Sequence, residues 1–238
     1  MFDFKDEVIV VTGAAGNLGR AVVNEFLKAD GCVCAFDHRR GRLKGSFTSA
    51  KALGELHLFE GVDVTDREVM IALGEKVLSQ VGKVEILVNT VGGFAYGETV
   101  YEMSSITWQK MMNLNVQSFL NTSAAFVPGM VEMGHGKIIS IGSKSSLQGG
   151  GKIGAYAAAK SALLRLTESM AAELKPHDIQ VNCVLPSIID TPENRQSMPS
   201  ADFSKWVKPE EIAQVILYLS SSMSDVITGA AVPVFGRA

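Results

Sequence analysis

The sequence predicts a doubly wound parallel α/β sheet of about seven strands, in a single domain that spans residues 1–238. Short apolar, β-branched runs alternate with helix-like segments along the whole chain, and parallel neighbouring strands require such helical crossovers. The strand-like runs are continuously apolar, as expected where helices cover both faces of a sheet. A length of 238 residues suits one domain of this class.

The boundaries of the expected elements follow from capping residues and prolines. Thr65 or Asp66 can cap a helix, Pro176 and Pro186 each end an element, and Pro209 suits the first turn of a helix. We expect strands at 8–11, 32–36, 56–59, 84–88, 137–141, 179–185 and 231–235. We expect helices at 18–28, 65–78, 108–131, 155–174 and 209–219.

Composition and charge exclude several classes of partner. With 22 Lys and Arg against 25 Asp and Glu, the chain lacks the basic excess typical of nucleic-acid or anionic-membrane surfaces. The longest uncharged run, 111–131, carries too many polar groups for a lipid span. Three cysteines without metal spacing and an acidic N-terminus indicate a reducing, cytoplasmic location. The histidines show no ligand spacing, so we expect no metal: His38, His57, His135 and His177.

A glycine-rich turn joins the first expected strand to the first helix, with the sequence Thr12-Gly13-Ala14-Ala15-Gly16-Asn17-Leu18-Gly19. Gly13 permits a tight turn, Gly16 lets the backbone approach a diphosphate, and Gly19 lets helix and strand pack closely. The N-terminus of the helix offers free N–H groups to that diphosphate. The turn alone also suits an ordinary strand–helix connection, but its place after the first strand predicts a dinucleotide site.

The end of the second expected strand bears on the choice of dinucleotide. Asp37 lies there, and its carboxylate can accept hydrogen bonds from both ribose hydroxyls of NAD while repelling the 2′-phosphate of NADP. The basic run that follows, 38–44, offers arginines that could hold this phosphate instead, although such runs are usually solvated loops. We therefore favour NAD, with NADP as the alternative.

A tyrosine and a lysine share one face of the helix at 155–174. Tyr156 and Lys160 are four residues apart, and an adjacent ammonium favours the phenolate and lowers the tyrosine pKa, which allows acid–base catalysis. Ser143 ends the fifth strand, where ligands bind in such sheets. Asn115 lies on the polar side of an apolar helix. Without a catalytic function, Tyr156 and Lys160 would be an exposed helical pair, and Asn115 would be an interior asparagine that bonds backbone groups.

These motifs, with Asp63-Val64, Asn89-Thr90-Val91-Gly92 and 186–191, resemble the short-chain dehydrogenase/reductase family over essentially the full length. The resemblance implies a three-layer α/β/α Rossmann fold and NAD(P)(H)-dependent hydride transfer to a carbonyl or from an alcohol. It also implies self-association, as a dimer or as a tetramer through the two long helices. The chain departs from the family pattern where Asn17 replaces a usual glycine, at Asn89-Thr90-Val91-Gly92, and at Ser187.

The resemblance also implies roles for single residues. Asn115, Ser143, Tyr156 and Lys160 correspond to the family's catalytic tetrad. Asp63 would contact adenine, Asn89 would order the central strands, and Thr191 would bond the nicotinamide carboxamide. The full set of expected cofactor contacts is Gly13, Gly16, Asn17, Leu18, Gly19, Asp37, Asp63, Val64, Asn89, Gly92, Tyr156, Lys160, Pro186, Ile188 and Thr191.

A substrate lid is expected at about 187–208. Its stretch 190–206, with Gly92-Gly93-Phe94, is similar to dihydropteridine reductases, so NADH-dependent reduction of a quinonoid pterin is an alternative. A second alternative is a 3-oxoacyl-carrier-protein reductase. A third is a dinucleotide sensor without turnover, against which the intact Ser, Tyr and Lys argue. The expected pocket for a mainly apolar small molecule is Phe94, Tyr96, Ser145, Leu147, Met198, Phe203 and Trp206, although Phe203 and Trp206 could merely pin a loop.

Overall fold

A seven-stranded sheet runs through the computed structural model, which describes residues 2–47 and 54–237. The strand order is β3-β2-β1-β4-β5-β6-β7, and every neighbouring pair is parallel. The strands are β1 (Val8–Thr12), β2 (Cys32–Asp37), β3 (Leu56–Glu60), β4 (Ile86–Asn89), β5 (Gly136–Ile141), β6 (Ile179–Pro186) and β7 (Ala231–Val234). The expected doubly wound parallel sheet is therefore confirmed.

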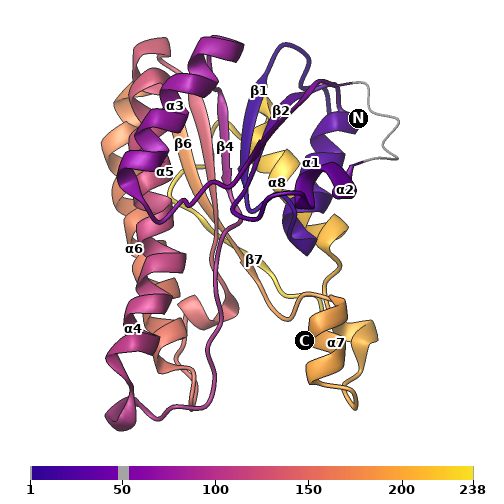
Figure 1. Cartoon of the computed structure of the whole chain (residues 1–238), viewed down its shortest axis with the longest axis vertical. Coiled ribbons are helices and arrows are strands. Elements are labelled where there is room, and N and C mark those ends of the chain that lie inside the picture. The colour runs from indigo at the N-terminus through magenta and orange to yellow at the C-terminus, as the bar shows by residue number, and fades with distance from the viewer. Residues whose placement is uncertain (1, 48–53, 238) are drawn as a thin grey trace.

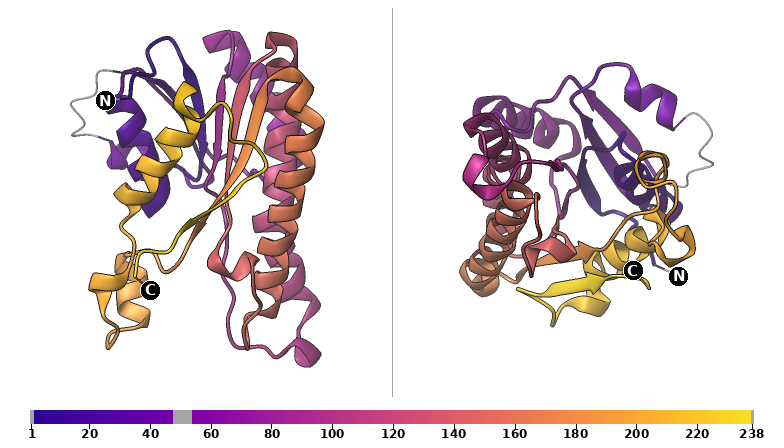
Figure 2. Two further views of the ribbon diagram at one scale, coloured as in Figure 1. Left: turned by 180° about the vertical axis from the view of Figure 1, so that it is seen from behind. Right: turned by 90° about the horizontal axis from the view of Figure 1, so that it is seen from below.

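Helices cover both faces of this sheet and complete three layers, as Figures 1 and 2 show. Helices α1 (Asn17–Lys28) and α8 (Pro209–Ser220) pack together on one face. The opposite face is covered by α3 (Arg67–Val81), α5 (Ser118–Met133) and α6 (Gly154–Leu174). The shorter helices are α2 (Arg42–Ser46), α4 (Ser105–Met112) and α7 (Pro192–Ser197).

The central strands explain why the chain reads as continuous apolar runs. Along β1, Ile9 and Val11 are buried in the core beneath α1 and α8, whereas Val8 and Val10 are buried in the core beneath α3, α5 and α6. Successive side chains of a strand point to opposite faces, so both sets must be apolar when both faces are covered. Each such side chain contributes roughly 1.5–3 kcal/mol by burial.

The expected long helix at 108–131 differs from the structure. The helix begins three residues earlier, because the hydroxyl of Ser104 caps it by accepting a 3.1 Å hydrogen bond from the Thr107 N–H. It is then interrupted by a π-helical stretch, Asn113–Gln117, before α5 continues to Met133 and ends at Gly134, whose φ is +71°. The periodicity of apolar residues could not reveal this local change of helix type.

The loops were less predictable than the sheet. The basic run 38–44, interpreted as a solvated loop, contains the start of α2, which follows Gly41 at a φ of +81°. Helix α7 was not expected either. It lies in the segment that carries the proposed lid and hangs below the sheet in Figure 1. Among the described residues, no helix combines the length and the apolar character that crossing a lipid bilayer requires.

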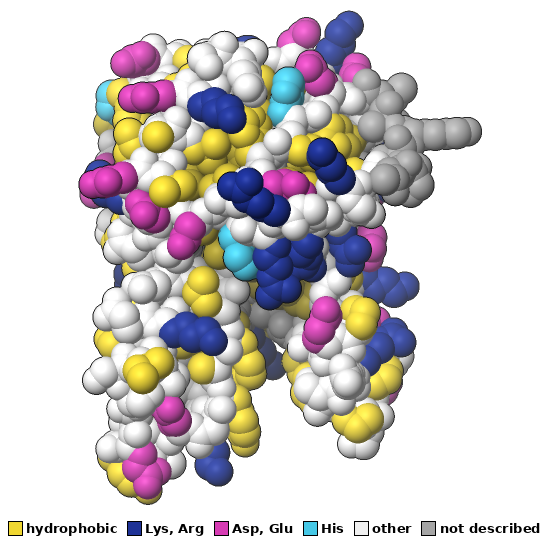
Figure 3. Space-filling model, in the orientation of Figure 1, with side chains coloured by type: hydrophobic (Ala, Val, Ile, Leu, Met, Phe, Trp, Pro, Cys, Tyr) yellow, Lys and Arg dark blue, Asp and Glu magenta, His cyan; other side chains and the backbone are white. Residues whose placement is uncertain are grey.

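The strand order locates the ligand site of this fold. The chain passes outward from β1 through β2 to β3 on one side, and from β4 through β5 to β7 on the other. Ligands bind beyond the carboxyl ends of the strands at such a switch point, here between β1 and β4. Figure 3 shows the molecule hollowed at this end, between the part that contains α4 to α6 and the part that contains α7.

Candidate active site

The glycine turn after β1 has the conformation that its sequence predicts. Gly13 has a φ of +63°, and its carbonyl accepts a 2.9 Å hydrogen bond from the Gly16 N–H. A Cβ on Gly19 would lie 2.2 Å from the Gly13 carbonyl oxygen, so only glycine lets α1 approach the turn so closely. Gly16 directly precedes α1, whose first N–H groups face the carboxyl end of the sheet.

Asp37 lies beside this turn at the end of β2. Its carboxylate is almost completely buried and accepts hydrogen bonds from the N–H groups of Ala15 (3.2 Å) and Arg39 (3.0 Å). The basic run also reaches the turn, because the Arg42 guanidinium donates to the Ala15 carbonyl at 3.3 Å. Lys and Arg side chains gather at the head of the hollow in Figure 3. Asp37, which favours NAD, and the basic run, which favours NADP, therefore both lie beside the glycine turn.

Asp63 follows β3, the neighbour of β2. The Val62 N–H donates to the Asp37 carbonyl at 3.1 Å, which brings this loop alongside the end of β2. The exposed Asp63 carboxylate accepts from the N–H and hydroxyl of Thr65. The Val64 carbonyl accepts from the Asn121 amide at 3.1 Å. Asp63 and Val64 are thus held in a fixed turn at the same edge of the sheet.

Lys160 is buried on α6 and points toward the end of β5. Its ammonium donates a 2.6 Å hydrogen bond to the Ile141 carbonyl. Burial disfavours the charged form and lowers the pKa of Lys160 to about 8. Lys160 therefore loses its proton at a lower pH than an exposed lysine does.

Asn115 belongs to the π-helical stretch and is held by backbone groups. Its side-chain oxygen accepts from the Gly93 N–H, and its amide donates to the carbonyls of Gly93 and Met111, all at 3.0–3.1 Å. A Cβ on Gly92 would lie 3.0 Å from the Asn115 side-chain oxygen and 3.1 Å from Lys160 Nζ. The loop after β4 thus lies against both Asn115 and Lys160.

Ser143, another member of the predicted tetrad, lies beside Tyr156. Its hydroxyl accepts from the Ser145 N–H at 3.1 Å and also hydrogen-bonds the Tyr156 hydroxyl. That bond lowers the pKa of Tyr156, but burial raises it more, so the net pKa lies above the usual 10. The expected lowering by Lys160 is therefore wrong for this structure, because the ammonium bonds the Ile141 carbonyl instead.

An aromatic side chain of the expected pocket packs against Tyr156. The Phe94 ring meets the Tyr156 ring edge-on, with centroids 5.0 Å apart and an interplanar angle of 80°. Phe94, Tyr96 and Leu147 are exposed, and Ser145 is half-buried. Of these residues, Phe94 contacts Tyr156 directly, so its exposed ring leaves an apolar surface beside the tyrosine.

The aromatic residues of the 187–208 segment mainly pack on each other. Phe203 lies 4.8 Å from the Trp206 ring, and the Arg195 guanidinium lies 4.9 Å above Phe203. Trp206 is only 7% exposed, so it fixes this segment to the core, whereas Phe203 and Met198 stay half-buried. Substrate contact by these three side chains remains a prediction.

The start of this segment is tied down by backbone bonds. Pro186 ends β6 beside Val234, and the Ile188 carbonyl accepts from the Val207 N–H at 3.1 Å. The buried Thr191 caps α7, accepting from the Asn194 N–H at 3.2 Å. The expected contacts Pro186, Ile188 and Thr191 therefore lie where β6 leads into α7.

Two further observations complete the site. The side-chain nitrogen of Asn89, buried at the end of β4, has no hydrogen-bond partner within the part of the chain that the structure describes. Sequence reasoning missed Glu193, whose carboxylate bonds the side chain of Asn17 in the glycine turn. No local pattern connects these two residues, which are far apart in the chain.

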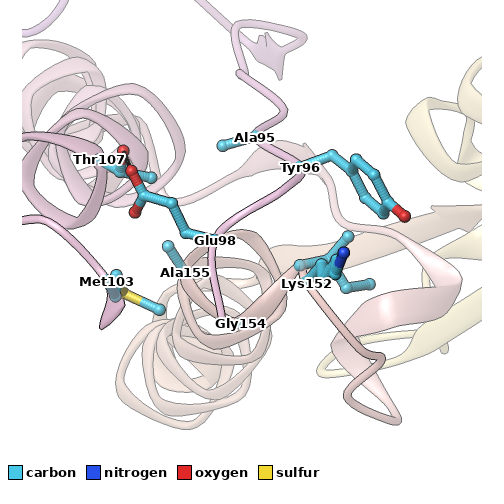
Figure 4. Close-up of a pocket in the computed structure, with 9 residues that line it drawn as sticks. Ala95, Tyr96, Glu98, Met103, Thr107, Lys152, Gly154 and Ala155 are labelled. Atoms are coloured by element: carbon cyan, nitrogen blue, oxygen red, sulfur yellow. Dashed lines mark hydrogen bonds between the residues drawn. The ribbon is translucent and has the colours of Figure 1, made fainter. Parts of the chain in front are cut away.

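A small cavity lies below the start of α6, as Figure 4 shows. It measures about 60 Å³, and the carboxylate of Glu98 on its wall accepts hydrogen bonds from Ser104 and Thr107. In Figure 4, Tyr96 and Lys152 lie on the opposite side. Ligand pockets usually measure about 300–1,000 Å³, and none of the predicted tetrad lines this cavity, so it is too small to be the substrate site and does not reach the tetrad, although the expected pocket residue Tyr96 lines it.

Comparison with known proteins reveals similarity over nearly the whole chain. A family model of short chain dehydrogenases matches residues 7–201. The 3-oxoacyl-[acyl-carrier-protein] reductase of Thermotoga maritima is 29% identical over 239 residues, covering 97% of this chain and 96% of the relative. The 2-dehydro-3-deoxy-D-gluconate 5-dehydrogenase of Dickeya dadantii is 30% identical over 246 residues, covering 99% and 96%.

Solved structures are similar over the same extent. A 3-oxoacyl-[acyl-carrier protein] reductase from Brucella melitensis with bound NAD has a TM-score of 0.86 and 29% identity, covering 98% of this chain and 91% of that one. The structure of ElxO with NADP bound has a TM-score of 0.88 and 25% identity, covering 97% of each chain.

Fold and similarity together define the class of protein: an oxidoreductase that acts on CH–OH or C=O groups with a nicotinamide dinucleotide. The chain belongs to the short-chain dehydrogenase/reductase family, whose model spans most of its length. One of the two cofactor-bound structures holds NAD and the other NADP. These structures support a nicotinamide dinucleotide as the cofactor. The choice between NAD and NADP depends on the residues of this chain.

Proposed function

We propose that this protein transfers hydride between NAD(H) and a carbonyl or alcohol substrate, with Tyr156 as the proton donor and acceptor. The observation that supports this most directly is the hydrogen bond between the hydroxyls of Ser143 and Tyr156. Buried Lys160 and Asn115 lie together nearby, against the loop after β4. Two hydroxyls that meet at the carboxyl end of a parallel sheet can bind one substrate oxygen between them.

The residues present fit a nicotinamide dinucleotide. The left-handed Gly13, the N–H groups of the first turn of α1 and the carboxylate of Asp37 form a cradle for a diphosphate and a ribose. The proposed contacts from the other strands are Asp63, Val64, Asn89, Gly92, Pro186, Ile188 and Thr191. When bound there, the dinucleotide supplies or accepts the hydride.

The protein residues would then handle the proton and the charge. Ser143 would donate a hydrogen bond to the carbonyl oxygen as negative charge develops on it, and Tyr156 would donate the proton to that oxygen. The ammonium of Lys160 would lower the pKa of Tyr156 only on moving from the Ile141 carbonyl toward the phenol. Asn115 would hold the loop after β4 in place through both of its bonds to Gly93.

The preference for NAD rests on Asp37. Its carboxylate is held by two N–H groups beside the turn, where it would accept the ribose hydroxyls and repel a 2′-phosphate. The guanidinium of Arg42, which bonds the neighbouring Ala15 carbonyl, is the feature that favours NADP. We propose NAD, because the carboxylate is fixed and buried, whereas most of the basic run is exposed.

The proposed substrate class follows from the exposed apolar side chains of the expected pocket. Phe94, which contacts Tyr156, and the exposed Tyr96 and Leu147 suit a mainly apolar small molecule. A carrier-protein thioester is the second candidate, since the Thermotoga maritima relative is a 3-oxoacyl-[acyl-carrier-protein] reductase. Arg195, a cation on the proposed lid, is already paired with Asp190 at 2.6 Å, which weakens a basic docking patch there. Quinonoid pterin reduction is the third candidate.

We also propose a single domain with a lid at about 187–208, self-association, and a cytoplasmic location. Exposed apolar side chains on and before α4, Val100, Tyr101 and Ile106, support self-association as a dimer or tetramer. The cysteines of the described chain are free, as in a reducing compartment. Light scattering coupled to gel filtration would measure the number of copies.

One assay separates the candidate functions. NADH and NADPH oxidation would be followed with small apolar ketones, a 3-oxoacyl thioester and a quinonoid dihydropterin. We expect the highest kcat/KM with NADH and an apolar carbonyl. Turnover of the dihydropterin alone would establish the pterin candidate. No turnover with any substrate, combined with tight NADH binding by calorimetry, would instead favour a dinucleotide sensor.

A further inference from the structure

A cysteine, a glutamate and a histidine meet at the amino end of the sheet, away from the candidate active site. Cys32 is the first residue of β2, and His57 lies on β3 in register with Cys34. The Val33 N–H donates to the Glu55 carbonyl at 2.8 Å, so Glu55 lies across from Cys32. The Cys32 sulfur, a Glu55 carboxylate oxygen and a His57 ring nitrogen all lie within 4.8 Å of one another.

Both strands present these side chains on one face. Residues two apart in a strand point the same way, so Cys32 with Cys34 and Glu55 with His57 form two adjacent pairs. Cys34 is fully buried, whereas Cys32 and His57 are half-buried and Glu55 is exposed. The three grouped side chains therefore lie at the rim of the core, where an ion from solvent can reach them.

The three donor types form a ligand set for a transition metal. Thiolate sulfur, imidazole nitrogen and carboxylate oxygen all bind Zn²⁺, at about 2.3, 2.0 and 2.1 Å. In a tetrahedral site these bond lengths imply separations of roughly 3.4–3.6 Å between ligand atoms. His57 Nε2 already lies 3.0 Å from Glu55 Oε1, so small side-chain rotations would bring the group to that geometry.

We propose that Cys32, Glu55 and His57 bind one Zn²⁺ ion, with water as the fourth ligand. The site would join β2 to the edge strand β3. It lies at the opposite end of the strands from Tyr156 and Ser143, so its role would be structural.

The charges around Cys32 agree with a cation at this place. The carboxylates of Glu55 and Glu85 both lie close enough to the Cys32 thiol to act on it electrostatically. Lys83 pairs with Glu85, and Glu55 has the imidazole of His57 as its partner. A divalent cation would replace this weak imidazole contact and stabilise the thiolate, because metal binding and thiol ionisation are coupled.

The spacing of the histidines predicted no metal, and the proposal departs from that expectation for a structural reason. Cys32 and His57 lie on different strands, and the register of β2 with β3 brings them together. Metal motifs that can be recognised from spacing contain pairs of ligands a few residues apart in the chain, and Cys32 and His57 belong to no such pair.

Zinc titration tests the site directly. The whole chain, reduced and freed of metal with a chelator, would be titrated with ZnCl₂ by calorimetry. We expect one ion per chain and a higher Tm with zinc than without it. Glu55→Gln and His57→Ala should each weaken binding at least tenfold, whereas His177→Ala, an exposed histidine elsewhere, should bind like the wild type.

Cobalt identifies the cysteine. Co²⁺ bound to a thiolate has a sulfur-to-metal absorption band in the near ultraviolet, which we expect in the wild type and in Cys34→Ala and expect to be lost in Cys32→Ser. Circular dichroism would verify that each variant is folded. If Cys32→Ser does not fold, zinc binding by Glu55→Gln, a substitution of an exposed residue, tests the site in its place. Zinc binding that survives both Glu55→Gln and His57→Ala, or a band lost only in Cys34→Ala, would overturn the proposal, as would no stoichiometric binding.

Discussion

The side-chain amide of Asn17 donates a 2.7 Å hydrogen bond to the carboxylate of Glu193 and so joins the glycine turn to α7. Arg20 in turn donates to the Asn17 side-chain oxygen at 3.0 Å. Hydrogen bonds from its own N–H, Asn17 and Thr191 lower the pKa of Glu193, so its carboxylate is ionised at neutral pH. A negative charge on the proposed lid therefore lies beside the turn that we propose binds a diphosphate.

Removing this charge should tighten cofactor binding. In Glu193→Gln we expect the Kd for NADH, measured by fluorescence titration, to fall by about twofold to fivefold, the range for an exposed charge pair. Glu210→Gln removes the same charge from the exposed start of α8 and should leave the Kd unchanged. A weaker affinity in Glu193→Gln would mean that the bond to Asn17 organises the turn for binding.

Tyr156→Phe tests the proposed proton donor. The variant keeps the ring that packs edge-on against Phe94 but loses the hydroxyl that bonds Ser143. We expect kcat to fall by at least about 100-fold, as for loss of a general acid, while the Kd for NADH is unchanged. Stopped-flow measurement of hydride transfer would verify that the chemical step has slowed. Full activity in this variant would exclude the role of the phenol.

Gly92→Ala tests the packing around Asn115 and Lys160. An added methyl group would lie 3.0 Å from the Asn115 side-chain oxygen and 3.1 Å from Lys160 Nζ, and it would displace one or both. We expect kcat/KM to fall by up to about 100-fold, since small displacements in an active site cost this much, with a minor change in Tm. Gly129→Ala, whose methyl group would meet no atom within 4 Å, is the matched control.

Lys160 should make stability depend on alkaline pH. Its folded-state pKa of about 8 lies below 10.5, so the unfolded chain binds more protons between these values and stability rises with pH in that window. Between about pH 7.5 and 9.5, wild-type unfolding free energy should gain about 2 kcal/mol relative to Lys160→Met. Urea denaturation at both pH values measures the difference. Parallel pH profiles of the two proteins would show that Lys160 keeps an ordinary pKa.

The sheet and its glycine turn were predictable because their signals are local. Apolar runs bounded by glycine or proline predict strands, and Gly19 is required by a contact only six residues away in the chain. Tyr156 and Lys160 share a helix face for the same reason. Ser143 could be placed by its position at the end of the fifth strand, whereas the role of Asn115 came only from a known family pattern.

Contacts between distant segments were not predictable from local patterns. The bond between Asn17 and Glu193 and the grouping of Cys32 with His57 depend on how loops and strands meet in the folded chain. The raised pKa of Tyr156 depends on the burial of its phenol in the folded chain, which spacing along a helix cannot predict. The π-helical conformation of Asn113–Gln117 likewise has no signal in the apolar periodicity of the sequence.

The π-helical stretch Asn113–Gln117 lies between two helices, α4 and α5, that pack against different neighbours. Before it, α4 packs against α6, and after it, α5 packs against α3. A π turn holds one residue more than an α turn, and one residue corresponds to about 100° of rotation around the axis. Loss of a single residue here would rotate the two halves out of phase and carry the amide at position 115 away from Gly93. Chain length within these five residues is therefore as constrained as their identity.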